Sequence, residues 1–129
     1  MMLSGAMDKS AIALSGVCIA HCLALPAVVA LLPALSASWF AGESFHLLLL
    51  FMVLPTSIVA LGLGCRHHRT YGILLWGTSG LLVLTAAAGL GQAWLGEAAE
   101  KVLTVIGATL VMVAHANNFR LCRHQDCDH

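Results

Sequence analysis

The sequence contains very little charge. Only 9% of its 129 residues are Asp, Glu, Lys or Arg, while 60% are hydrophobic, and the mean hydropathy is +0.91. Soluble domains carry about 25% charged residues, so this composition excludes an ordinary soluble domain and indicates an integral membrane protein. The formal net charge is zero with histidine neutral, and this balance gives no indication of a nucleic-acid partner.

The sequence also lacks the features of a secreted, disulfide-bonded domain. Its five cysteines are an odd number, and none falls in an evident extracellular segment. The first apolar run, Ala11–Leu35, is longer than the roughly 7–15 residues of a secretory signal peptide. We therefore expect an uncleaved first membrane helix, and we interpret the thiols as ligands, redox groups or small buried residues.

Four apolar runs are long enough to cross a bilayer as helices, which takes roughly 20 residues. They are Ala11–Leu35, Phe45–Gly64, Gly72–Trp94 and Ala98–Ala116. Because the connections are short, we predict an all-α, integral membrane four-helix bundle of antiparallel sequential neighbours. The expected organisation is a cytoplasmic N-terminus, the membrane domain and a cytoplasmic Cys/His tail, at residues 1–10, 11–119 and 120–129.

The basic residues predict the orientation of the bundle. With both termini in the cytoplasm, five basic residues lie on the cytoplasmic side, namely Lys9, Arg66, Arg69, Arg120 and Arg123. The outer side then holds only Lys101. This distribution follows the positive-inside rule, and it predicts a multi-pass protein of the bacterial inner membrane with both termini inside.

The first apolar run contains a cluster of potential metal ligands in the string "LSGVCIAHCLALP". On a helix, Cys18 and Cys22 are about 40° apart and one turn along, with His21 in the same sector. Two thiolates at this spacing can chelate a soft cation, and the imidazole can complete a third position. The alternative is that the cysteines are small packing residues. An intramembrane histidine favours function, so we predict a metal site, with Cys22 near mid-membrane.

Three further features are candidates with an open alternative. His115 shares a helical stripe with Thr104 and Asn118, and it is either a metal ligand near the depth of Cys18 or a packing residue. The tail "LCRHQDCDH" places Cys122 and Cys127 beside histidines, and such a segment can wrap a metal without a preformed fold. Its alternative is a disordered polar tail. Finally, the motif Gly16-x-x-x-Ala20 predicts close packing of the first helix.

The first-helix string, the "RHHR" turn and "VMVAHANNFRLCRH" together resemble the MerC family of mercuric-ion uptake proteins, over roughly residues 8–124. The resemblance implies a four-span membrane transporter whose first-helix thiol pair falls on Cys18 and Cys22. It also implies that the tail thiols are Cys122 and Cys127. One departure is that mercury transporters carry C-x-x-C, whereas this sequence has C-x-x-x-C with His21 between the thiols. Two thiolates suit linear Hg(II), and a Cys2His set suits Zn(II) or Cu(I) at least as well.

The leading functional hypothesis is therefore an inner-membrane transporter of Hg(II), without enzymatic activity and without a permanently bound cofactor. Outer-face residues would draw in the cation, namely Glu43, His46, Glu97 and Glu100. Cys18 and Cys22 would take it, assisted by His21 or His115, and release it to the tail. The expected partners are membrane lipid, the metal ion, a periplasmic metal donor, a cytoplasmic thiol acceptor and a second copy of the chain.

Three alternatives remain open at this point. A Zn(II) or Cu(I) carrier would use Cys18, His21 and Cys22. A thiol-disulfide oxidoreductase is disfavoured, because cysteines four apart on a helix rarely reach the Cα separation that a disulfide requires. A haem-binding bundle would use two of His21, His46 and His115. The depths of His21 and His46 match poorly, whereas His21 with His115 is geometrically conceivable.

Overall fold

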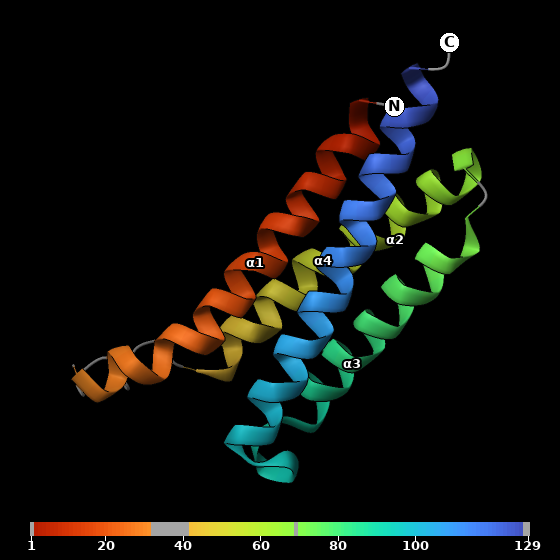
Figure 1. Ribbon diagram of the computed structural model, residues 1–129. Helices are drawn as coiled ribbons and strands as arrows, with labels where there is room; N and C mark the ends of the chain where they lie inside the picture. Colours follow the sequence, from red (N-terminus) through yellow and green to blue (C-terminus); the bar gives the residue numbers. More distant parts are fainter. Residues whose placement is uncertain (1, 32–41, 69, 128–129) are drawn as a thin grey trace.

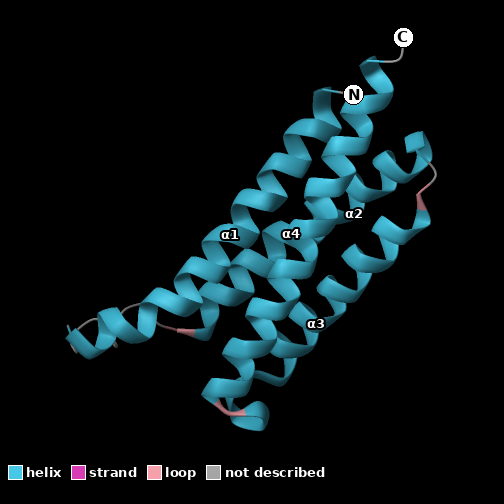
Figure 2. Ribbon diagram, in the orientation of Figure 1, coloured by secondary structure: helices cyan, strands magenta, loops and turns pink. Residues whose placement is uncertain are grey.

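The structure is a computed structural model that describes residues 2–31, 42–68 and 70–127. Four helices make up the molecule: α1 (Met2–Leu31), α2 (Glu43–His68), α3 (Tyr71–Leu95) and α4 (Glu97–Cys127). All regular secondary structure within the described residues is helical, as Figure 2 shows. The predicted all-α four-helix architecture is confirmed.

Each helix contains a segment that is long and apolar enough to cross a membrane. These segments are Gly5–Ala24, Ser44–Gly64, Tyr71–Gly91 and Glu97–Cys122. The lateral surface is correspondingly apolar, since large side chains such as Phe51, Leu75 and Trp94 are mostly exposed. In water such a surface would be unfavourable, whereas hydrocarbon chains solvate it well. The chain is therefore a multi-pass membrane protein.

The helices run up and down, so that both termini lie at one end of the bundle together with the turn between α2 and α3 (Figure 1). The end of α1, the start of α2 and the α3–α4 turn lie at the opposite end. Consecutive helices contact one another as predicted, and α4 also packs along α1 and α2. The helix α4 is thus in contact with all three others, and polar side chains on its inner stripe are buried between helices.

The first and fourth helices extend furthest beyond the predicted spans. The first begins at Met2 instead of Ala11, and the fourth continues to Cys127 instead of ending at Ala116. The two extensions pack against each other, since the Lys9 ammonium lies 5.3 Å from the centre of the Phe119 ring. Segments 1–10 and 120–129 are therefore continuous with membrane helices as far as the structure describes them. The charged residues that had suggested span ends there lie within the helices, with Asp8 buried and Lys9 and Arg120 exposed.

A close backbone contact joins α3 and α4 through two glycines. A Cβ atom on Gly80 would lie 2.9 Å from the Gly107 carbonyl oxygen, and one on Gly107 would lie 3.0 Å from the Gly80 oxygen. Gly16, in contrast, has no atom within 4 Å of its virtual Cβ. The prediction of close packing at Gly16 is wrong, because this glycine faces away from the neighbouring described helices.

Candidate metal centre

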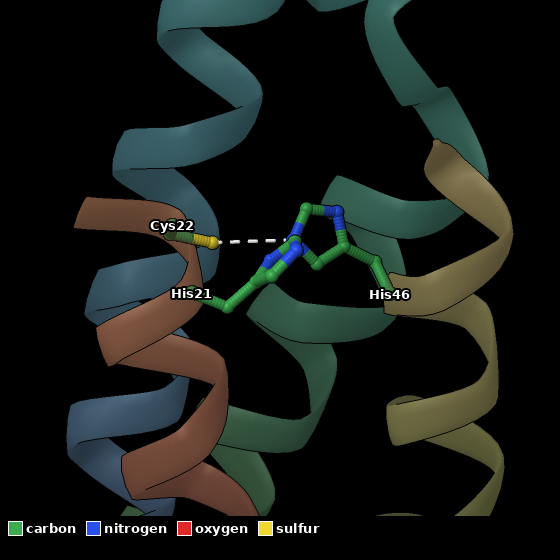
Figure 3. Close-up of side chains that lie close together, drawn as sticks. All are labelled: His21, Cys22 and His46. Atoms are coloured by element: carbon green, nitrogen blue, oxygen red, sulfur yellow. Dashed lines mark hydrogen bonds between the residues drawn. The ribbon is translucent and has the colours of Figure 1, made fainter. Parts of the chain in front are cut away.

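Three potential metal ligands from two helices meet at one end of the bundle. His21 and Cys22 come from α1 and His46 comes from the first turns of α2, as Figure 3 shows. The Nε2 atom of His46 lies 3.2 Å from the Sγ atom of Cys22. One ligand atom from each residue lies within 4.8 Å of the other two. The predicted residues His21, Cys22 and His46 are thus brought together.

Ring contacts fix the orientation of the two imidazoles. The His21 ring packs on Phe45, with centroids 4.4 Å apart, and meets the His46 ring edge-on at 5.2 Å. Cys22 is only 3% exposed. Since these side chains are already confined by packing, the site loses little conformational entropy when an ion is bound.

The ligand set consists of one thiol sulfur and two imidazole nitrogens. Such a set suits soft and borderline ions, including Zn(II), Cu(I) and Hg(II). Two ligands of a tetrahedral zinc ion, at 2.0–2.3 Å from the metal, are about 3.5 Å apart. The 3.2 Å between Cys22 and His46 is already close to this separation, so the two helices can hold an ion without moving apart.

Cys18 lies one turn further along α1 and is linked to this group. The two thiols of the predicted pair interact with each other, and both side chains belong to one buried cluster. Cys18 also lines a cavity whose wall is otherwise formed mostly by aliphatic side chains. The polar groups of the cavity wall are Ser15, Cys18, His46, Glu100 and Thr104. The cavity therefore extends from the His46 side of the cluster along Cys18 towards the bundle interior.

One hydroxyl in the cavity wall has no bonding partner. Ser15 is 2% exposed, and its Oγ atom makes no hydrogen bond. A buried hydroxyl without a partner costs free energy, on the order of 1–3 kcal/mol. A water molecule in the cavity would supply the missing interaction.

Glu100 is a site residue whose role the sequence analysis missed. It had been assigned to the outer face, yet its side chain is only 3% exposed and its Oε1 atom lies 3.7 Å from Nδ1 of His46. Because His46 turns its other nitrogen to Cys22, the carboxylate stands where outer-shell groups orient metal-binding histidines. Glu97, in contrast, is exposed and ion-paired with Lys101. The sequence did contain an indication of this burial, because Glu100 lies one helical turn before Thr104 and so belongs to the same stripe of α4.

The cluster lies near the end of the membrane segments and not at their centre. Cys22 is close to the end of Gly5–Ala24, and His46 is close to the start of Ser44–Gly64. The prediction that Cys22 lies near mid-membrane is wrong, because α1 begins at Met2 and Cys22 is therefore displaced towards the α1–α2 end. In the predicted orientation this is the outer end.

The structure does not bring His115 to this cluster. Its Nδ1 atom lies 2.6 Å from Asp8 and its Nε2 atom lies 3.0 Å from the Ser57 hydroxyl. Asp8 precedes Cys18 by ten residues, or about 15 Å along α1, so the expectation of similar depth is wrong. His21 lies thirteen residues, or about 20 Å, from Asp8 along α1, so the haem arrangement that paired His21 with His115 loses its geometric basis.

The tail thiols lie at the other end of the bundle. Cys122 follows Glu100 on α4 by twenty-two residues, or about 33 Å, and is half-buried. The side chain of Cys127 lies outside the described residues. None of the three cysteines that the structure describes, Cys18, Cys22 and Cys122, forms a disulfide. A metal ion would therefore have to cross most of the membrane between Cys22 and the tail.

The fold and the cluster together define a multi-pass membrane protein with a candidate site for a soft metal ion. The family model of the MerC mercury resistance protein matches residues 8–120, so the chain belongs to the MerC family. The matched region contains His21, Cys22 and His46 and ends before Cys122. Comparison with curated proteins and with solved structures found no match.

Proposed function

We propose that this protein carries Hg(II) across the bacterial inner membrane into the cytoplasm, with His21, Cys22 and His46 as the entry site. The observation that carries the proposal is the convergence of one thiol and two imidazoles within 4.8 Å in a MerC-family membrane protein. The family is described as one of mercury resistance proteins. The proposal accordingly assigns binding and transport to the chain and no catalytic residue.

Thiolate chelation solves the main energetic problem of such transport. A bare dication is prohibitively costly in hydrocarbon, and metal binding releases the protons of its thiol ligands. Two deprotonated thiols, Cys22 and Cys18, would cancel the charge of the ion. An inside-negative potential then favours inward movement by about 2.3 kcal/mol per charge per 100 mV.

The proposed route begins at the α1–α2 end and proceeds along α1. A periplasmic donor would deliver the ion to Cys22 and His46, and Cys18 would take it by ligand exchange about 6 Å further in. The cavity beside Cys18 and Ser15 provides space for this transfer. Cys122 and Cys127 would then offer thiols at the cytoplasmic end, from which a soluble thiol acceptor would remove the ion.

A second candidate function is Zn(II) or Cu(I) transport, and the two imidazoles favour it. Hg(II) prefers two thiolates in a line, whereas one thiolate with two histidines is a common set for zinc and copper. The preference of the site for one of these ions therefore depends on whether Cys18 or the two histidines bind the ion together with Cys22. Competition between the ions separates the two candidates.

The test is metal binding and uptake by the full-length protein in lipid. Purified protein in nanodiscs is titrated with Hg(II), Zn(II) and Cu(I) under competition, and proteoliposomes are assayed for ion influx. We expect the wild type to bind Hg(II) tightly and to show potential-driven influx. Cys22→Ser should lose both binding and influx, whereas Cys122→Ser should keep Hg(II) binding. Preferential binding of Zn(II) or Cu(I) would replace mercury as the cargo, and binding that survives Cys22→Ser would refute the site.

A further inference from the structure

A second group of buried polar side chains lies about 20 Å from the metal cluster along α1. Asp8 from α1, Ser57 from α2, and His115 and Asn118 from α4 are all fully buried. The Nδ1 atom of His115 lies 2.6 Å from Asp8 Oδ1, and Asn118 donates from Nδ2 to the other carboxylate oxygen at 2.8 Å. The His115 Nε2 atom lies 3.0 Å from the Ser57 hydroxyl. Three helices thus meet at one hydrogen-bonded cluster.

We propose that Asp8, His115, Ser57 and Asn118 form a proton-binding site in the half of the membrane nearer the chain termini. Ionisable residues buried in a bilayer are costly, and they characteristically serve ion pathways and proton relays. The cluster can hold a proton or release it with its heavy atoms in place. Ser57 makes this possible, because its hydroxyl can either donate or accept.

The two protonation states differ by one hydrogen on His115. In the deprotonated state, Nδ1–H donates to Asp8 and Nε2 accepts the Ser57 hydroxyl hydrogen, so the cluster carries one negative charge. When a proton binds at Nε2, this nitrogen donates to Ser57, whose hydroxyl turns towards a carbonyl of its own helix. The imidazolium and the Asp8 carboxylate then sum to zero charge, while Asn118 keeps the carboxylate oriented.

Few other charges act on this cluster. From α1, Lys9 is exposed, and its ammonium lies over the Phe119 ring of α4. Arg120 on α4 and Tyr71, the titratable side chain of α3, are also exposed. The group that α2 presents to Asn118 is uncharged, since the Asn118 side chain donates a hydrogen bond to the backbone oxygen of Ala60. Among the described side chains, the charge of the cluster is therefore set by Asp8 and His115.

A hydrolytic role does not fit the same geometry. The order Asp, His and Ser is that of a nucleophilic triad, but all three side chains are fully buried. The cavity wall contains none of them, so a substrate could not reach the Ser57 hydroxyl. A proton does not need an open substrate pocket. The residues of the cluster lie within two helical turns of the ends of their membrane segments, on the side where the chain termini lie.

The proton site extends the proposed function, since its charge can regulate the passage of a cation. A deprotonated cluster carries a negative charge that attracts the ion inward from Cys18, and protonation from the termini side removes this attraction. Metal influx and proton binding would then alternate. The existence of the proton site itself does not depend on which metal is carried, or on whether transport occurs.

The direct test is solid-state NMR of histidine side-chain nitrogens in the full-length protein in liposomes, recorded as a function of pH. His115→Gln assigns the His115 signals. We expect them to change between the neutral and the doubly protonated ring in one titration, and we expect Asp8→Asn to alter that titration. Thr109→Val, which removes an exposed hydroxyl bonded to its own helix, should leave it unchanged. A His115 ring in one protonation state throughout the folded pH range would overturn the proposal.

A transport measurement tests the linkage separately. Hg(II) influx into proteoliposomes is measured at fixed outer pH and varied inner pH, for the wild type and for Asp8→Asn, which removes the negative charge of the cluster. Influx should depend on inner pH in the wild type and lose most of that dependence in Asp8→Asn, with metal affinity unchanged within about twofold. Equal pH dependence in both proteins would refute the linkage. If the wild-type protein shows no Hg(II) influx while its His115 still titrates, the proposed transport function is refuted and the proton site is retained.

Discussion

The Nε2 atom of His46 lies 3.2 Å from the Sγ atom of Cys22, although the two residues belong to different helices. This contact connects the start of α2 to α1 at the end of the bundle that is predicted to face the periplasm. A metal ion bound there would tie the two helices together through its ligands. The site is thus both the proposed entry point and a mechanical link between α1 and α2.

The first prediction concerns the ligands themselves. Replacing Cys22 with Ser, or His46 with Ala, should weaken Hg(II) binding by about 100-fold or more, because loss of an outer-shell partner alone costs 10–100-fold. Competitive titration in nanodiscs measures the effect. Cys122→Ser is the matched thiol control, since Cys122 is remote from the cluster. Equal losses from Cys22→Ser and Cys122→Ser would contradict the assignment of binding to the His21, Cys22 and His46 cluster.

The second prediction concerns Glu100. Replacing it with Gln keeps the shape of the side chain but removes the negative charge next to His46, and we expect metal affinity to fall by about tenfold. Glu97→Gln is the matched control, because Glu97 is exposed and pairs with Lys101 on the same helix. Isothermal titration of the three proteins provides the comparison. A larger effect from Glu97→Gln would mean that surface attraction, and not orientation of His46, is the dominant contribution.

The sequence predicted the four spans and the shared sector of Cys18, His21 and Cys22, because hydropathy and helical periodicity depend only on neighbours along the chain. It did not predict that Asp8 lies against His115, since periodicity defines a helix face but not the axial register between two helices. Asp8 was assigned to a polar N-terminal segment for this reason. Glu100 was predicted at the outer face, but its burial against His46 was not, because its charge suggested the surface.

The third prediction concerns the cavity. Ser15 Oγ is buried without a hydrogen-bond partner, so Ser15→Ala should stabilise the fold by about 1 kcal/mol. If the hydroxyl contacts the ion or its water in transit, influx should slow by about tenfold, while equilibrium affinity at Cys22 stays constant. Ser10→Ala is the control, since Ser10 is exposed and bonds to its own helix. Unchanged influx in Ser15→Ala would place the route elsewhere.

The fourth prediction concerns orientation. The positive-inside rule and the common location of the two termini (Figure 1) predict that both ends of the chain are cytoplasmic. A fluorescent protein that matures only in the cytoplasm should therefore fluoresce when fused after His129. A periplasmic phosphatase fused at the same position should be inactive. The reverse pair of results would invert the bundle and place the Cys22 cluster at the cytoplasmic face.

The last prediction concerns the packing that positions α4. Gly107→Ala places a methyl group 2.9 Å from Leu84 Cγ and 3.0 Å from the Gly80 carbonyl oxygen, and backbone atoms cannot yield as a flexible side chain does. We expect destabilisation of about 1–3 kcal/mol, measured by unfolding in detergent. Gly89→Ala has no atom within 4 Å of the added carbon and should be neutral or slightly stabilising, because alanine favours the helix. Since α4 supplies both Glu100 and His115, a Gly107→Ala protein that still folds should show weaker metal binding and altered His115 titration together. If only its stability changed, α4 would hold the two sites independently of its contact with α3.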